Sequence, residues 1–249
     1  MVERISTSAI PTKPVAVLFD VDDTLYDYAS AKSAADKVLE EQVESFLGVP
    51  ASLCRSMFSQ ARQDVKDRLE ETASGHNRLL YIQRMIEMMG FKSKPLLSLY
   101  LEEMYWRAYF QNAVLFSGVI DTLEWLKESN ILVGIVSDLT ARLQLRKLVY
   151  FGLESYFDAI VTSEETGVDK PDKRNFDLAL SKLGLGKESG QIWMVGDDPS
   201  SDMVGGQTIN AVTFQKVHRD IDVGQDEAAP DFLIREFDEL YDFILDCAG

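Results

Sequence analysis

Short runs of consecutive apolar residues recur along the chain, and polar or glycine-rich residues follow each of them. The first run is Val-Ala-Val-Leu-Phe at 15–19, and others lie at 131–136, 159–161, 192–195 and 211–214. A continuous apolar run of this length suits a strand that is buried on both faces. Stretches with helical periodicity precede the later runs. The order is therefore β-α-β-α, which predicts an α/β fold with a parallel sheet.

The segment from 29 to 112 interrupts this order, because it is helical throughout and holds no convincing strand. Gly-Val-Pro, Ser-Gly-His and Gly-Phe-Lys breaks separate its helices. We therefore expect two domains: a core formed by 1–28 and 113–249, and an inserted bundle of four helices at 29–112. The predicted helices are Ala31–Leu47, Ser52–Thr72, Asn77–Met89 and Pro95–Phe110.

The composition is that of an ordinary soluble globular protein, with 46% hydrophobic and 27% charged residues. The net charge of −16 argues against binding to nucleic acid polymers and to anionic membranes. An anionic substrate would need a local cationic group, and a divalent metal is the most compact one.

The cysteines, Cys54 and Cys247, lie far apart and have no metal-ligand spacing, so we expect free thiols. The sequence also shows no signal-peptide pattern and no apolar stretch of membrane-spanning length, which predicts a cytoplasmic location.

Two acidic residues, Asp20 and Asp22, directly follow the first apolar run. In open α/β sheets, ligands bind outside the carboxyl ends of the strands. Residues two apart on an extended backbone point the same way, so these carboxylates share a small volume and need a cation or a shared proton. An Asp pair after a strand also commonly begins a solvated turn, so this stretch alone leaves both interpretations open.

Further polar residues follow the later apolar runs at comparable positions. Ser137 follows the second run, Lys170 lies in a loop after the third, and Asp197 and Asp202 follow the fourth. Taken singly, Ser137 would be interpreted as a turn hydroxyl and Lys170 as an exposed charge. Their occurrence in series after predicted strand ends favours one shared site.

These segments resemble, in order, the four motifs of the haloacid dehalogenase superfamily of phosphohydrolases, which implies a Rossmann-like core. The resemblance covers nearly the whole chain. One motif would be weak support, but four in order with suitable spacing are specific. The matching segments are Phe19-Asp20-Val21-Asp22-Asp23-Thr24-Leu25, Val136-Ser137, Lys170-Pro171-Asp172 and Gly196-Asp197 through Asp202.

The resemblance implies a role for each of these residues. Asp20 would attack phosphorus to give an aspartyl-phosphate, and Asp22 would protonate the leaving oxygen and then deprotonate water. The cofactor would be Mg²⁺, bound by Asp20, the backbone carbonyl of Asp22 and Asp197. Ser137 and Lys170 would hold the phosphoryl oxygens, and Lys170 would also offset the charge of Asp20. The predicted activity is Mg²⁺-dependent hydrolysis of small phosphate monoesters, such as a sugar phosphate, a nucleotide or a phosphoglycolate-like compound.

Four further residues have supporting interpretations. The resemblance implies that Asp202 supports the metal or its waters, whereas Asp198 either joins it or only extends the loop. Thr24 either hydrogen-bonds within the first loop or caps the next helix. Asp138 departs from the Asn or Gly that many relatives carry; it either faces the substrate, where it would disfavour acidic leaving groups, or turns into solvent.

The helical insert resembles the cap of the subgroup that contains phosphoglycolate phosphatases, β-phosphoglucomutase, nucleotidases and the dehalogenases. A cap excludes water and selects the substrate. Only about thirty residues separate Ser137 from Lys170, too few for a second cap. The polar or aromatic cap residues that we consider for substrate contact, none of which we assign, are His76, Arg78, Arg84, Trp106 and Arg107.

Three alternative activities are open at this stage. A phosphomutase shares the aspartyl-phosphate half-reaction, and the motif residues do not separate it from a phosphatase. A dehalogenase is disfavoured, because it needs no general acid two positions after the nucleophile, where Asp22 stands. A non-enzymatic phosphoacceptor module is disfavoured by the position of the Asp after the first strand and by the helical insert.

Overall fold

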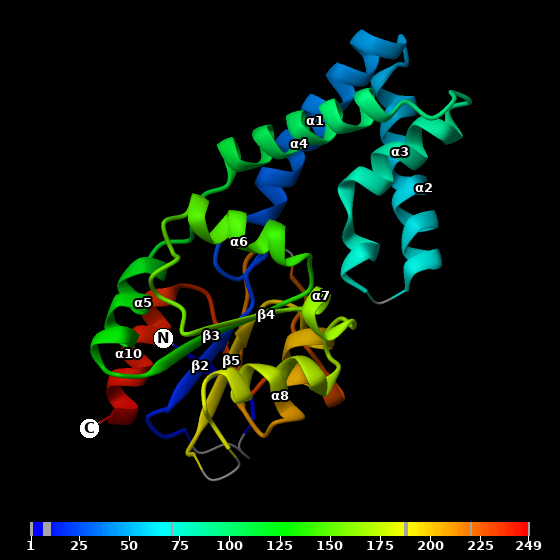
Figure 1. Cartoon of the computed structure of the whole chain (residues 1–249). Helices are drawn as coiled ribbons and strands as arrows, with labels where there is room; N and C mark the ends of the chain where they lie inside the picture. The colour runs from blue at the N-terminus through cyan, green and yellow to red at the C-terminus, as the bar shows by residue number, and fades with distance from the viewer. Residues whose placement is uncertain (1, 7–10, 71, 187–188, 220, 249) are drawn as a thin grey trace. The chain divides into compact units, whose positions relative to one another are not determined.

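A computed structural model describes the chain except for residues 1, 7–10, 71, 187–188, 220 and 249 (Figure 1). The chain forms two compact units. One combines residues 1–26 with 115–249, and the other comprises residues 27–114. In the described part of the chain, no helix is both long and apolar enough to span a membrane.

A mixed sheet is the centre of the first unit. Within the described residues it has seven strands in the order β1-β7-β6-β5-β2-β3-β4. All neighbouring pairs are parallel except β1 and β7, which run antiparallel at the edge. The predicted α/β fold is confirmed, and the prediction missed both β1 and β7. The strands are β1 (Glu3–Arg4), β2 (Ala16–Phe19), β3 (Leu132–Ser137), β4 (Ala159–Thr162), β5 (Ile192–Gly196), β6 (Val212–Lys216) and β7 (Phe232–Ile234).

Both faces of the sheet are covered, which explains the unbroken apolar runs. Along β2, Ala16 and Leu18 belong to a core that includes Phe176 of α8 (Lys173–Lys182). Phe19 stacks on Phe237 of α10 (Phe237–Ala248), with ring centroids 6.3 Å apart. Successive side chains of a strand point to opposite faces, so α8 and α10 lie on opposite sides of the sheet, as Figure 1 shows.

The remaining helical segments of this unit connect its strands. Helix α5 packs beside α10, and α9 lies beside α8. Helix α6 follows β3 and packs against β4 and α7. The segments are α5 (Val119–Glu128), α6 (Ala141–Tyr150), α7 (Ser163–Thr166), α9 (Val204–Gln207), a π-helical turn η2 (Pro199–Met203) and a 3-10 turn η3 (Asp226–Ala228).

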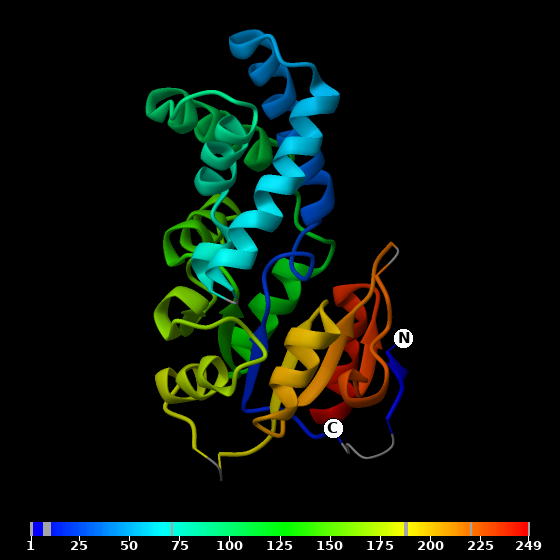
Figure 2. The same cartoon turned by 90° about the vertical axis from the view of Figure 1, so that its right-hand side faces the viewer.

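In the described residues of the second unit, every regular element is helical. Helix α1 packs along α4, and α2 packs along α3 (Figures 1 and 2). Asn77 caps α3 by accepting hydrogen bonds from two backbone N–H groups, which satisfies donors that the first turn leaves unpaired. The elements are α1 (Tyr28–Leu47), α2 (Ala51–Leu69), a 3-10 turn η1 (Ala73–His76), α3 (Arg78–Met88) and α4 (Pro95–Asn112).

The observed helices match the expected ones to within a few residues at their ends. The largest differences are at α1, which begins at Tyr28 where Asp27 caps it, and at α2, which ends at Leu69. The prediction had continued this helix to Thr72, through position 71, which lies outside the described residues. Glu70 adopts a positive φ of 50° after Leu69, and a right-handed helix does not continue through that conformation.

Candidate functional site

Asp20 lies at the centre of the carboxyl edge of the sheet. Its strand, β2, pairs with β3 on one side and with β5 on the other. The Asp20 backbone N–H donates to the Val195 carbonyl at 3.0 Å, which extends this pairing by one residue. The side chain is buried, because Asp20 is only 6% exposed. After β2 the chain continues to β3 on one side, whereas after β5 it continues to β6 on the other side. Open α/β sheets bind ligands at such a switch point.

Lys170 brings two carboxylates together beneath this edge. Its Nζ lies 2.6 Å from Oδ1 of Asp20 and 2.6 Å from Oδ1 of Asp202. Burial alone would lower the pKa of Lys170, but the negative charges of Asp20 and Asp202 raise it well above its usual value. The ammonium is therefore charged, and it bridges residues 150 and 32 positions away in the sequence.

Asp197 completes an acidic cluster with Asp20 and Asp202. One carboxylate oxygen from each residue lies within 4.8 Å of the others. Burial raises the pKa of Asp197 well above its usual value, and repulsion from Asp202 and Asp20 adds to this effect. Thr24 donates from its hydroxyl to Oδ1 of Asp197 at 3.2 Å, so it reaches across to the loop after β5.

The cluster fits a small divalent cation. Burial raises the pKa of Asp20, against the opposing attraction of Lys170, and the charge of Asp22 raises it further. Lys170 alone does not balance the carboxylates of Asp20, Asp197 and Asp202. Hard oxygen donors are the ligands that Mg²⁺ prefers, and a bound cation would relieve the repulsion among them.

The two acidic residues around the η2 turn lie in different surroundings. Asp202 is 1% exposed, and its carboxylate packs against the Gly196 backbone. A Cβ at position 196 would lie 2.2 Å from Oδ2 of Asp202, so only glycine fits at the end of β5. Asp198 instead caps η2 by accepting from the backbone N–H and the hydroxyl of Ser200, at 2.8 and 2.7 Å.

Asp22 contacts residues that the sequence analysis missed. Lys147 of α6 places its Nζ 2.6 and 2.7 Å from the two carboxylate oxygens of Asp22. The Tyr26 hydroxyl also donates to Oδ1 of Asp22. Lys147 matches none of the motif segments, and Tyr26 stands just beyond the first, so position in the sequence gave no signal for either.

Ser137 lies at the end of β3 and is 3% exposed. Gln144, three residues before Lys147 on the same helix, donates from Nε2 to the Ser137 hydroxyl oxygen at 2.5 Å. A hydrogen bond from Ser137 also acts to lower the pKa of Asp20, which indicates that the hydroxyl lies beside the carboxylate. Gln144 and Lys147 are both buried.

Asp138 is half-buried, and its carboxylate turns toward the loop of Lys170, contrary to the alternative that turned it into solvent. Its Oδ1 accepts the backbone N–H of Lys170 at 2.8 Å, so it holds the loop that carries the lysine. Burial raises the pKa of Asp138 to about 7, against the opposing attraction of Lys170.

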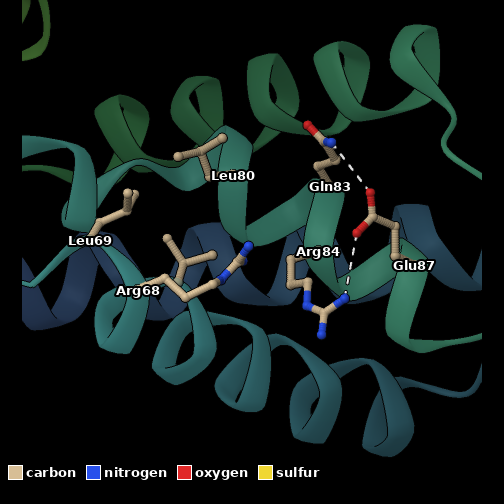
Figure 3. Close-up of a pocket in the computed structure, with 7 residues that line it drawn as sticks. Arg68, Leu69, Leu80, Gln83, Arg84 and Glu87 are labelled. Carbon is tan, nitrogen blue, oxygen red and sulfur yellow. Dashed lines mark hydrogen bonds and ion pairs between the residues drawn. The ribbon is translucent and has the colours of Figure 1, made fainter.

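Two of the arginines considered in the helical unit, Arg78 and Arg84, have partners within that unit. Arg78 is 9% exposed; it donates to the Tyr28 hydroxyl at 2.6 Å and lies over the ring of Trp106. Arg84 lines a pocket of about 260 Å³ between α2 and α3 (Figure 3). It pairs with Asp64 at 2.8 Å and with Glu87 at 3.6 Å, so its charge is already matched.

Comparisons with known proteins agree on one family. The family model described as haloacid dehalogenase-like hydrolase matches residues 17–215. The ribulose-1,5-bisphosphate 5-phosphatase of Halopiger xanaduensis is 35% identical over 199 residues, which cover 80% of this chain and 82% of that protein. The glyceraldehyde 3-phosphate phosphatase of Methanopyrus kandleri is 30% identical over 237 residues, which cover 94% of this chain and 98% of that protein.

A solved structure gives the same result for the fold. The crystal structure of a phosphatase of this family from Thermococcus onnurineus aligns with a TM-score of 0.69 at 26% identity, covering 92% of this chain and 97% of that one.

Proposed function

Because this chain belongs to the haloacid dehalogenase-like hydrolases and is a phosphatase of that family, we propose that it hydrolyses small organic phosphate monoesters in a Mg²⁺-dependent reaction through an aspartyl-phosphate on Asp20. The observation that carries this proposal is the buried contact of 2.6 Å between Asp20 Oδ1 and Lys170 Nζ at the carboxyl end of β2. A nucleophilic carboxylate there must approach an anionic phosphate. The ammonium supplies positive charge at the point where the two would otherwise repel.

The reaction that we propose has two steps. Asp20 attacks phosphorus, the bond from phosphorus to the leaving oxygen breaks, and Asp22 gives that oxygen a proton. Water then attacks the phosphorus of the aspartyl-phosphate, Asp22 takes a proton from the water, and the Asp20 carboxylate departs. Ser137 and Lys170 hold the phosphoryl oxygens in both steps.

In this proposal Asp20 and Asp197 would hold the metal by their carboxylates, and Asp22 would hold it by its backbone carbonyl. The ion would neutralise charge on the phosphoryl group, as divalent cations do in phosphoryl transfer. Asp202 keeps Lys170 in place through the contact of 2.6 Å. Thr24 orients Asp197, while Asp138 and Asp198 fix the loops that carry the site, as their hydrogen bonds indicate.

The proposed substrates are phosphorylated small sugars, with nucleotides and phosphoglycolate-like esters as the other members of the class. The curated relatives named above act on ribulose-1,5-bisphosphate and on glyceraldehyde 3-phosphate. Residues 29–112 are proposed as the cap that selects among these esters.

The test is steady-state phosphate release from a panel of sugar phosphates, nucleotides, phosphoglycolate and an aryl phosphate, with Mg²⁺ and with a chelator. We expect hydrolysis that requires Mg²⁺ and that Asp20→Asn abolishes, because an amide neither attacks phosphorus nor forms the acyl phosphate. Asp242→Asn, an exposed substitution on α10, is the matched control and should keep wild-type rates.

Full activity of Asp20→Asn would refute the assigned nucleophile. A rearranged phosphate ester with little free phosphate would refute hydrolysis and identify a phosphomutase instead. Acid-quenched enzyme incubated with a labelled substrate should carry phosphate on wild-type protein and none on the Asn variant.

A further inference from the structure

Helix α6 buries two polar residues, while two of its apolar residues are exposed. Gln144 and Lys147 are 0% and 1% exposed, whereas Leu145 and Val149 are 47% and 63% exposed. Burying an ammonium group is costly unless it is paired and hydrogen-bonded. The buried ammonium of Lys147 therefore requires an anionic partner.

That partner is the Asp22 carboxylate. Lys147 Nζ contacts both of its oxygens, at 2.6 and 2.7 Å, so the ammonium fixes the plane of the carboxylate as well as its charge. The Tyr26 hydroxyl donates to Oδ1 from a ring that is fully buried and that packs on Phe151, with centroids 5.0 Å apart. Two rigid donors thus hold one short side chain.

The contact leaves one side of Asp22 accessible. The Lys147 side chain is 1% exposed, while the Asp22 side chain is 28% exposed. The lysine therefore meets the carboxylate from the interior, and the remaining surface of the carboxylate is open to exchange a proton with a substrate oxygen or with water.

We propose that Lys147 is a positioning residue, which holds the Asp22 carboxylate in the orientation that proton exchange requires. This inference rests on the proposed function, in which Asp22 is the general acid and base. Lys147 does not touch the substrate in this role. A displacement of a catalytic group by about 1 Å can cost on the order of a hundredfold in rate, so the fixed orientation has a measurable consequence.

The same helix serves a second residue of the site. Gln144 lies on the buried side of α6 with Lys147 and donates to the Ser137 hydroxyl oxygen at 2.5 Å. One rigid element thus sets both the proton-exchanging carboxylate and a proposed phosphate-binding hydroxyl. Sites supported by a helix in this way keep their geometry better than sites on free loops.

The test is a set of kcat and KM values for Lys147→Met and Lys147→Arg, each in the wild-type and the Asp22→Asn background, with Mg²⁺ and an alkyl phosphate that the wild type hydrolyses. We expect Lys147→Met to lower kcat by about ten- to a hundredfold with KM nearly unchanged, and to add no loss when Asp22 is already Asn. Arginine also donates two parallel hydrogen bonds to a carboxylate, so Lys147→Arg should recover part of the lost kcat.

p-Nitrophenyl phosphate gives a second readout that a purely structural lysine would not affect. p-Nitrophenolate leaves without needing a proton, so formation of the aspartyl-phosphate should be little changed in Lys147→Met. Attack of water on that intermediate still needs Asp22 as a base. The variant should therefore release a burst of about one p-nitrophenolate per chain before a slow steady state.

Lys182→Met on α8 is the matched control, because this lysine also pairs with a carboxylate, Glu165 at 2.6 Å, away from the acidic cluster. It should keep wild-type kcat. If Lys147→Met does not fold, Tyr26→Phe removes the hydroxyl that donates to Asp22 and should show a smaller loss that also disappears in the Asp22→Asn background.

An equal loss of kcat in both backgrounds, or a change confined to KM, would overturn the positioning role. Neither outcome would affect the proposed nucleophile, since that assignment depends on Asp20→Asn. Conversely, turnover by Asp20→Asn would refute the proposed function whatever the lysine variants do.

Discussion

At the scale of single residues, the site is a balance between buried carboxylates and buried lysines. Asp20 and Asp202 both form ion pairs with the ammonium of Lys170, and Asp22 forms one with the ammonium of Lys147. Buried charges are retained where a partner and hydrogen bonds offset the loss of hydration. Asp138 differs, because its carboxylate accepts a backbone N–H and has no ammonium within hydrogen-bond distance among the described contacts.

Asp138 should make the stability of the protein depend on pH. Its pKa is about 7 in the folded chain and near 3.8 when the chain is unfolded. The folded state therefore holds a proton over this window that the unfolded state releases, so the contribution of Asp138 to stability is most favourable below about pH 4 and falls as pH rises to about 7. The total change is on the order of 4 kcal/mol, at about 1.4 kcal/mol for each unit of pKa.

Asp138→Asn keeps the acceptor oxygen and removes the ionisation. We expect the free energy of unfolding in urea, measured with a chelator present, to favour the variant over the wild type by an amount that grows from pH 5 to pH 8. A difference that stays constant over this range would contradict the raised pKa of Asp138. Asp242→Asn, which is exposed, should show no such trend.

At the scale of elements, the ends of strands and one face of a helix determine where the charges meet. Strands β2, β3 and β5 end within two residues of one another, because Phe19 at the end of β2 is paired with Ile135 and Val195 near the ends of the other two. The residues that follow them therefore emerge at one edge. The end of β5 is tight, since the Asp202 carboxylate occupies the space beside Gly196.

Gly196→Ala should disturb the site through this packing. The added Cβ would lie 2.2 Å from Asp202 Oδ2, so the carboxylate must move, and Lys170 would lose part of its anchoring. We expect a loss of about 1–3 kcal/mol in the free energy of unfolding, together with reduced kcat. Chemical denaturation and phosphate release measure the two effects.

Gly186→Ala is the control for that substitution, because nothing lies within 4 Å of the position its Cβ would take. It should match the wild type in both measurements. Wild-type stability of Gly196→Ala would mean that the space beside β5 is not as tight as the packing indicates.

At the scale of the whole molecule, the charge of −16 makes the fold repel anionic ligands. The attraction that a phosphate ester needs must then come from local groups, and the acidic cluster is the place where a divalent cation fits. Binding of an ion to the folded state alone raises the stability of the whole chain by linkage.

Mg²⁺ should therefore raise the melting temperature through this cluster. At a hundredfold excess over its Kd the gain is about 2.7 kcal/mol, which corresponds to roughly 5–10 °C for a chain of this size. We expect Asp197→Asn to lose most of the shift and Asp242→Asn to keep it, as measured by thermal unfolding against NaCl of equal ionic strength. An equal shift in all three proteins would indicate screening of the net charge instead of a site.

The sequence by itself determined the class of fold and the residues of the proposed chemistry. Apolar runs long enough for strands buried on both faces, each followed by polar residues, predict the sheet and its carboxyl edge. Strands β1 and β7 escaped prediction because they are two and three residues long. Runs that short carry no periodicity.

Only the tertiary structure decided which charges meet. Lys147 is 125 residues from Asp22, and its helix exposes Leu145 while it buries Lys147, so no local pattern links the lysine to that carboxylate. The use of Asp138 as an acceptor for the Lys170 backbone depended in the same way on the approach of two loops. Local patterns record whether a position is apolar, whereas the pairing of buried charges depends on contacts between segments that are distant along the chain.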